Sequence, residues 1–237
     1  MGMNKTVEIV VAHYNENLDW LKPYANNVVI YHKWKDEGPR FPVKKWVKLN
    51  NIWREAHTYI YHIVNNRDSL ADITIFLQWW INDHLKEMLV YKDLNLYISE
   101  VEKYWFSTRR LWFLVKSKNQ INWEWKFLEA MNKWELLKSE YSFEEYYKII
   151  FKIKQPKIIP VFFAANFWVS KWKIKNHNIN FYRWILENIP NHYQPEEAHF
   201  LERLRFVIFN KKVNFHYLQK IIMNPIVWLF LKLKNIF

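Results

Sequence analysis

Hydrophobic residues fall in short continuous runs that alternate with amphipathic stretches in the first part of the chain. Residues 7–12 are all apolar except Glu8, and residues 27–32 (NVVIYH) form a second run. Each run predicts a strand of a central sheet. Residues 73–77 (ITIFL) are a β-branched run that predicts a third strand. Between the second and third runs, residues 54–64 place apolar side chains on one helical face. The pattern predicts an α/β fold with a mainly parallel central sheet flanked by helices.

The second half of the chain has a different texture. Residues 88–151 are polar and aromatic, with charge pairs at helical spacing, and predict a helical insertion. Residues 161–169 (VFFAANFWV) predict a return to strand, and 181–189 and 195–209 predict two helices. Proline at the start of the last helix and two glutamates in its first turn suit a helix amino terminus.

Residues 1–212 are therefore expected to form one α/β domain, followed by a C-terminal amphipathic helix over 213–237. The apolar part of that tail, 225–237, is too short to span a bilayer. It can pack on the domain or lie in a membrane interface. Since no signal-peptide pattern precedes the first strand, we expect a cytoplasmic protein, with peripheral contact at the inner face of the membrane as the alternative.

The formal net charge of +12 narrows the partners to anions: phosphates, nucleotides, nucleic acid or acidic lipids. Part of this charge lies in the long basic loop 33–49, and loops of that length are often functional. The chain has no cysteine, which excludes disulfides and thiolate chemistry and leaves oxygen and imidazole ligands for any metal.

Polar side chains follow the predicted strands where ligands bind α/β sheets. Asn15 and Glu16 follow the first strand, and Gln78 ends the third. Arg54 and Glu55 open the helix between them, where a guanidinium and a helix amino terminus favour phosphate. Two structural alternatives stay open: a turn without a ligand after the first strand, and an Arg–carboxylate pair that only fixes the loop.

The motifs REAHTYIYHIVNN, LADITIFLQ and NDH resemble an uncharacterised family, a domain of unknown function found in bacteria and fungi. That family usually reads Gly-Arg-Glu-x-His-Thr-Tyr, then Phe-Leu-Gln-Gly, then Asp-His. The opening EIVVAHYNENLDWL and the late PEEAHFLERLRFVIF are also similar to its pattern, so the resemblance covers most of residues 8–209.

The resemblance implies a distant relation to nucleotide-diphospho-sugar transferases of the GT-A type, and hence a GT-A-like fold. It implies a sugar transferred from a nucleotide-sugar donor to a glycan or lipid-linked acceptor. In GT-A enzymes an acidic loop motif holds a divalent cation on the donor diphosphate, which makes Asp83 and His84 the expected ligands of Mg²⁺ or Mn²⁺. The usual Asp-x-Asp spelling is absent, and Asp83 can instead cap the next helix.

The predicted helix over 195–209 carries the remaining chemistry. Glu202 is the expected base that deprotonates an acceptor hydroxyl, and His199 is the second expected catalytic residue. Arg203 is expected to bind the donor. The structural alternative is a buried pair of Glu202 with Arg54 or Arg203. A non-catalytic nucleotide- or glycan-binding protein remains the alternative function, while nucleic-acid binding would leave the acidic strand-edge residues unused.

The glycine count is unusual. Average usage predicts roughly 17 glycines in a chain of this length, and the 2 glycines and 15 tryptophans together reach that figure. Trp34, Trp53 and Trp79 stand where a turn or the family pattern calls for glycine. We therefore hypothesise that many of these tryptophans are really glycines. This would happen if the organism uses UGA as a glycine codon and the gene was translated with a different genetic code. The high aromatic content then says little about base or sugar stacking.

Overall fold

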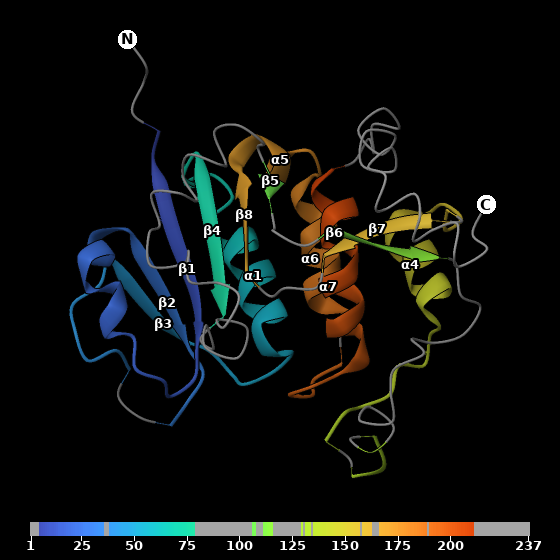
Figure 1. Cartoon of the computed structure of the whole chain (residues 1–237), viewed down its shortest axis with the longest axis horizontal. Helices are drawn as coiled ribbons and strands as arrows, with labels where there is room; N and C mark the ends of the chain where they lie inside the picture. Colours follow the sequence, from blue (N-terminus) through green and yellow to red (C-terminus); the bar gives the residue numbers. More distant parts are fainter. Residues whose placement is uncertain are drawn as a thin grey trace.

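The computed structural model describes residues 5–35, 38–78, 106–107, 111–115, 129, 131–133, 135–156, 158–162, 166–188 and 190–210. These residues form an α/β structure with helices against a mixed sheet, so the α/β prediction is confirmed (Figure 1). The elements of the first half are β1 (Val7–His13), the 3-10 helix η1 (Asp19–Asn27), β2 (Val28–His32), β3 (Lys45–Lys48), α1 (Arg54–Asn65) and β4 (Ile73–Gln78).

The second half contributes shorter strands and most of the helices. Its described elements are β5 (Phe106–Ser107), β6 (Leu111–Val115), α4 (Phe143–Phe151), β7 (Ile158–Phe162), β8 (Phe167–Ser170), α5 (Lys171–Lys175), α6 (Ile179–Glu187) and α7 (Glu196–Phe209). Among the described residues, no helix is both long enough and apolar enough to cross a bilayer.

The main sheet has six strands in the order β3-β2-β1-β4-β8-β5. The pairs β3/β2, β2/β1 and β1/β4 are parallel, whereas β4/β8 and β8/β5 are antiparallel. Strands β6 and β7 form a separate antiparallel pair, which lies near α4 and α7 in Figure 1.

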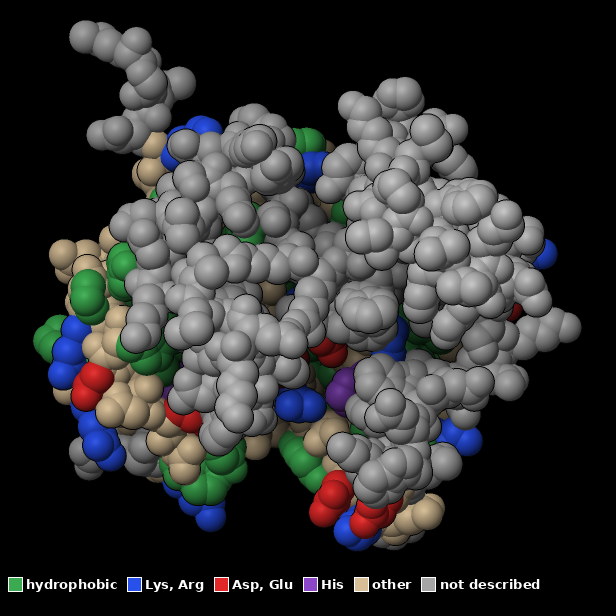
Figure 2. Space-filling model, viewed as in Figure 1, with side chains coloured by type: hydrophobic (Ala, Val, Ile, Leu, Met, Phe, Trp, Pro, Cys, Tyr) green, Lys and Arg blue, Asp and Glu red, His purple; other side chains and the backbone are tan. Residues whose placement is uncertain are grey.

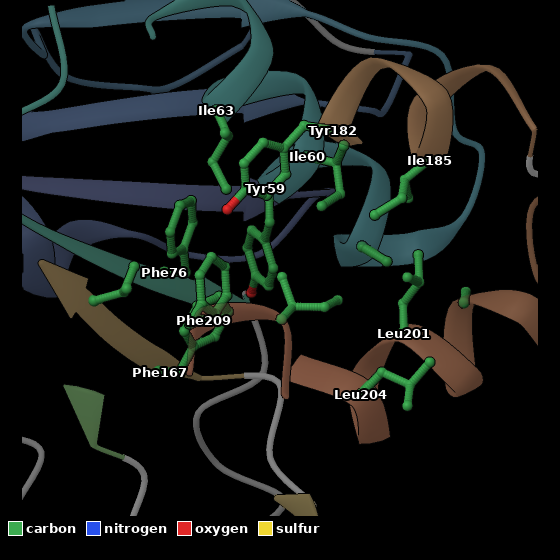
Figure 3. Packing of buried hydrophobic residues seen from close by; sticks show 14 of the residues in the cluster. Tyr59, Ile60, Ile63, Phe76, Phe167, Tyr182, Ile185, Leu201, Leu204 and Phe209 are labelled. Carbon is green, nitrogen blue, oxygen red and sulfur yellow. The ribbon is translucent and has the colours of Figure 1, made fainter. Parts of the chain in front are cut away.

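Both faces of the central strands are buried, as the continuous apolar runs predict. On β1, Ile9 and Val11 pack with Leu21 of η1, whereas Val10 and Ala12 pack toward α1. The buried cluster on the α1 side of the sheet is the larger of the two, because α1 also packs against α6 and α7. Figure 3 shows this cluster, in which α1, α6 and α7 meet the aromatic side chains of Phe76 and Phe167.

Three local predictions need correction. The loop 33–49 contains an edge strand, β3, which was not predicted because its sequence, KWVK, has a lysine at each end. The run 161–169 is not one strand: β7 ends at Phe162 in the small sheet and β8 begins at Phe167 in the main sheet. Two short strands, β5 and β6, lie in the stretch 88–151 that the sequence predicts as helical. Most of that stretch, and the predicted tail helix over 213–237, lie outside the described residues.

Candidate functional site

The four parallel strands end at one edge of the sheet, and polar side chains gather there. β1 ends at His13, β2 at His32, β3 at Lys48 and β4 at Gln78. The chain first adds β2 and β3 on one side of β1, and then returns through α1 to place β4 on the other side. Open α/β sheets bind ligands at the carboxyl edge where the strand order reverses in this way.

The β1 end of this edge carries a histidine pair and a small pocket. The Nδ1 atoms of His13 and His32 lie 2.9 Å apart, and His13 Nε2 lies 3.0 Å from the Glu16 carbonyl oxygen. Asn15 and Glu16 line a pocket of about 30 Å³ with residues 38–41. Glu16 Oε2 accepts a bond from the Tyr14 backbone N–H at 3.0 Å. Its Oε1 is buried without a hydrogen-bond partner in the described part of the chain.

Lys33 connects this edge to the start of α1. Its side chain is buried, and Nζ donates to the carbonyl oxygens of Ile52, at 2.8 Å, and Arg54. Burial lowers the pKa of Lys33 to about 7, although the nearby carboxylate of Glu55 acts in the opposite direction. The two bonds hold the turn at Trp53 and Arg54, which both have positive φ. They therefore fix the position from which the Arg54 side chain extends.

We expect Lys33→Met to lower the free energy of unfolding by about 1–3 kcal/mol, because it leaves two carbonyl groups without their donor. The pH dependence should also change. Since the folded pKa of about 7 lies below the ordinary lysine pKa of 10.5, the unfolded chain binds more protons between these values, and wild-type stability should rise with pH across that window. Urea unfolding across this window checks both effects. Lys45→Met, at an exposed lysine of β3, should keep the wild-type slope.

Trp53 bears on the glycine hypothesis. Its φ is 54° and it caps α1 without a side-chain hydrogen bond, a conformation that costs a non-glycine residue about 1–2 kcal/mol. Trp34 does not share this feature: among the described non-glycine residues, positive φ occurs at Trp53, Arg54 and Lys152. The Trp53 ring is nevertheless buried, and Nε1 donates to the Pro190 carbonyl at 2.6 Å. Backbone geometry favours glycine at 53, and the hypothesis stays a prediction.

Peptide mass spectrometry of the protein from its natural source tests the hypothesis directly. The peptide that spans position 53 should carry the mass of glycine there, because the backbone is left-handed at that residue. A peptide with the mass of tryptophan at position 53 would remove the hypothesis for this site. The peptide that contains Trp20, in η1, is a useful comparison within the same sample.

Five of the predicted site residues lie together where α1 begins beside α7: Arg54, Glu55, His199, Glu202 and Arg203. Arg54 Nε lies 3.8 Å from Glu55 Oε2, and His199 Nδ1 lies 4.0 Å from Glu202 Oε2. The Arg54 and Glu202 side chains are 46% and 25% exposed, so solvent and ligands reach both. In Figure 2, acidic, basic and histidine side chains adjoin near the middle of the face.

The environment of this cluster sets its charges. Burial raises the pKa of Glu202, and Glu55 adds to this, while Arg205, Arg203 and Arg54 oppose it. Burial, with Arg54 and Arg203, lowers the pKa of His199 to about 4, so the imidazole is neutral at pH 7. Burial lowers the pKa of Arg203 only to about 10, so it stays cationic. The cluster thus combines a carboxylate of raised pKa, which can accept a proton, with the exposed Arg54 guanidinium, which can hold an anion. The Arg203 guanidinium is buried and donates to the His199 carbonyl at 3.4 Å, so it adds positive charge from behind the cluster.

Two backbone amides at the start of α1, those of Trp53 and Arg54, already have acceptors within the protein. Trp53 N–H donates to the His192 carbonyl at 3.0 Å, and Arg54 N–H to that of Tyr193 at 3.1 Å. These two amides are therefore not available to the predicted phosphate, and among the side chains at this helix start the Arg54 guanidinium is the cationic group.

The other predicted residues lie elsewhere or outside the described chain. Gln78 ends β4 opposite Ala12, and its backbone N–H donates to Asn166 Oδ1 at 2.7 Å. Asn15 and Glu16 lie in the pocket after β1, which shares no lining residue with the α1/α7 cluster. Asp83 and His84 lie outside the described residues, and among those residues no group of three or more His, Asp or Glu could hold a metal ion.

Some residues at this edge were missed from the sequence. Lys33 was one lysine among several in a basic loop, and only its burial distinguishes it. Arg205 lies three residues after Glu202 on α7, so helical spacing could have placed it on the same side. Tyr59 belongs to the apolar face of α1, and its helical spacing predicts a core residue without a functional role.

Comparison with known proteins identifies a family whose function is unknown. A family model described as "Protein of unknown function (DUF3431)" matches residues 9–220. No curated protein and no solved structure matches the chain.

Proposed function

Because the chain belongs to the DUF3431 family of proteins of unknown function, we propose its activity from its own side chains: it is a glycosyltransferase with a GT-A-like fold. It moves a sugar from a nucleotide-sugar donor to a glycan or lipid-linked acceptor. The protein works in the cytoplasm, and residues 213–237 either pack on the domain or make a peripheral contact with the inner face of the membrane.

One observation carries the proposal: α1 and α7 bring Glu202 and His199 together with Arg54 and Arg203 at the carboxyl edge of the sheet. Glycosyl transfer from a nucleotide donor releases a diphosphate, and it removes a proton from the acceptor. Guanidinium groups stabilise the first, and a carboxylate with a raised pKa accepts the second. The switch point between β1 and β4 supports a ligand at this edge.

In this reaction the acceptor oxygen attacks the anomeric carbon of the donor sugar. The new carbon–oxygen bond forms as the bond from that carbon to the phosphate oxygen breaks, and the electron pair leaves with the nucleoside diphosphate. Glu202 takes the acceptor proton, and Arg54 and Arg203 stabilise the leaving charge. Asn15, Glu16, Glu55 and Gln78 position the donor. Asp83 and His84 would hold Mg²⁺ or Mn²⁺, which supplies further charge to the diphosphate when bound.

Thermal-shift screening with nucleotide sugars, with and without Mn²⁺, tests the proposal, together with an assay for released nucleoside diphosphate. Stabilisation and release support a transferase. Stabilisation without release, whatever acceptor is added, supports a nucleotide- or glycan-binding protein instead. A response to oligonucleotides alone would contradict both and attribute the net charge to nucleic-acid binding.

A further inference from the structure

The short helix α5 lies at the opposite end of the sheet from the start of α1. β8 runs antiparallel to β4 and ends at Ser170, beside Ile73, the first residue of β4. α5 follows at once, and the Lys171 backbone N–H donates to the Asp72 carbonyl oxygen at 2.9 Å. α5 is therefore at the amino edge of the parallel strands, whereas Arg54 follows their carboxyl edge (Figure 1).

Lysine side chains gather at this amino edge. Three of the five residues of α5 are lysines, and a fourth lysine precedes β1: Lys5, Lys171, Lys173 and Lys175. Asp72 connects the two segments, because hydrogen bonds from Thr6 lower its pKa and the charges of Lys171 and Lys5 add to this. In the described turn that leads into β4, the acidic residues are Asp68 and Asp72, so the surface keeps an excess of positive charge.

An aromatic side chain stands among these lysines. Trp172 is 47% exposed, and Lys173 Nζ lies 4.6 Å from the centroid of its ring. An exposed indole beside lysines is the combination that proteins use at the boundary between lipid headgroups and acyl chains. The lysines carry the inference, since the glycine hypothesis extends to tryptophan positions such as this one. In Figure 2, basic side chains show at the top of the molecule, where Figure 1 labels α5.

The chemistry of this surface favours lipid over nucleic acid. Arginine is the residue whose planar fork suits the phosphates and bases of nucleic acids, but Arg67, the arginine described at this edge, is engaged. It donates to the carbonyl oxygens of Ile174, at 2.9 Å, and His177, at 2.6 Å. The cations that remain for a partner are lysines, and clustered lysines are typical of contacts with anionic membranes.

The described chain also ends at this surface. Lys173 Nζ donates to the side-chain oxygen of Asn210, the last described residue. From there the sequence continues with Lys211 and Lys212 and closes with the apolar stretch 225–237. The folded surface and the sequence that continues from it therefore suit the same kind of partner, one with anionic headgroups and an apolar interior.

We propose that α5, together with Lys5, forms a docking surface for membranes that carry anionic lipids. The lysine ammonium groups meet the headgroup phosphates, and each of them should strengthen binding about fivefold. Docking through the amino edge leaves Arg54, at the other edge, open to solvent. The inference does not depend on the proposed transferase activity.

Vesicle co-sedimentation of the full-length protein tests the proposal. The protein should bind vesicles of phosphatidylcholine with phosphatidylglycerol and not vesicles of phosphatidylcholine alone, and added salt should weaken the binding. The triple variant Lys5→Gln/Lys171→Gln/Lys175→Gln, which keeps the Lys173 contact with Asn210, should bind about 30- to 100-fold more weakly than wild type.

A matched triple variant separates the position of the charge from its total. Lys35→Gln/Lys45→Gln/Lys48→Gln removes the same net charge from exposed lysines of the loop 33–49, and β3 is at the far side of the sheet from β8. Its affinity for the anionic vesicles should stay within about threefold of wild type, because charges beyond a Debye length are screened. Circular dichroism confirms that both variants are folded.

The proposal is overturned if wild type ignores phosphatidylglycerol, or if the two folded triple variants lose affinity equally. Binding of an oligonucleotide that the α5 triple variant loses, in a protein that does not bind vesicles, would also overturn it and assign the surface to nucleic acid. Release of nucleoside diphosphate is measured on the same samples. Vesicle binding without release means that the transferase assignment has failed and the docking surface has not, and release without vesicle binding means the reverse.

Discussion

Glu202→Gln should lower kcat for glycosyl transfer by about 10²–10⁴-fold, the range expected when a general base is removed. Glutamine has nearly the same shape but cannot accept the acceptor proton. Donor binding should stay near wild type, because the guanidinium groups of Arg54 and Arg203 are retained. The free energy of unfolding at pH 7 should be equal or higher, since burial raises the pKa of Glu202 and its charged form is therefore the less stable one in the folded protein.

The pH profile distinguishes a base from a merely structural carboxylate. Glu202 must be ionised to act, and its pKa is raised, so wild-type kcat/KM should fall on the acid side at a pH above the ordinary range for glutamate. The residual activity of Glu202→Gln should lack that decline. Glu187→Gln, at an exposed glutamate that ends α6, should leave both rate and profile unchanged. A Glu202→Gln variant with the wild-type rate contradicts the assigned role.

The sequence was informative wherever one local pattern decides the structure. Continuous apolar runs located β1, β2 and β4, and one-sided periodicity located α1, because burial imposes those spacings. The proline and the two glutamates at its start located α7, which is buried on nearly every side. The same two helices carried Arg54, Glu55, His199, Glu202 and Arg203, so finding the helices also found the charged cluster.

The errors arose where tertiary context overrides local pattern. β3 has charged ends and an exposed tryptophan, so its alternation is hidden, and it is a strand because it pairs with β2. The run 161–169 is apolar throughout, and periodicity gives no sign that the chain changes sheets within it. Lys33 differs from the other lysines of its loop in being buried, which no spacing reveals. The spacing of Tyr59 predicts that it is buried but not that charged groups lie near it.

His62→Phe should lower the free energy of unfolding by about 1.5–3 kcal/mol, the range for a buried polar contact with a charged group, because Glu8 keeps its contact with Lys44. His62 is fully buried, with Nε2 3.1 Å from Glu8 Oε2 and Nδ1 3.0 Å from the Tyr31 hydroxyl. Phenylalanine fills the space of the ring but leaves the carboxylate and the hydroxyl without this partner. Urea unfolding monitored by circular dichroism measures the loss.

His57→Phe is the matched control, because it makes the same substitution on the same helix. His57 is also buried, but it contacts the rings of Trp53 and Tyr61, and its Nδ1 has no hydrogen-bond partner among the described residues. Replacing a buried polar atom without a partner by an apolar group is nearly neutral or stabilising. Equal losses in the two variants would mean that ring packing, and not the Glu8 contact, is what His62 contributes.

Acid titration gives an independent measure of the same contact. Burial alone would raise the pKa of Glu8, but the contacts with His62 and Lys44 outweigh it and lower the pKa below the ordinary glutamate value of 4.5. A carboxyl with a lowered folded pKa stabilises the protein above its unfolded pKa, and this contribution is lost as the pH falls through the folded value. The stability difference between wild type and Glu8→Gln should therefore shrink below pH 4.5. In His62→Phe, Glu8 keeps only Lys44 of these two partners. Its Nζ lies 2.7 Å from Glu8 Oε1, and its side chain is half exposed, so Glu8→Gln should have a smaller pH-dependent effect in that background.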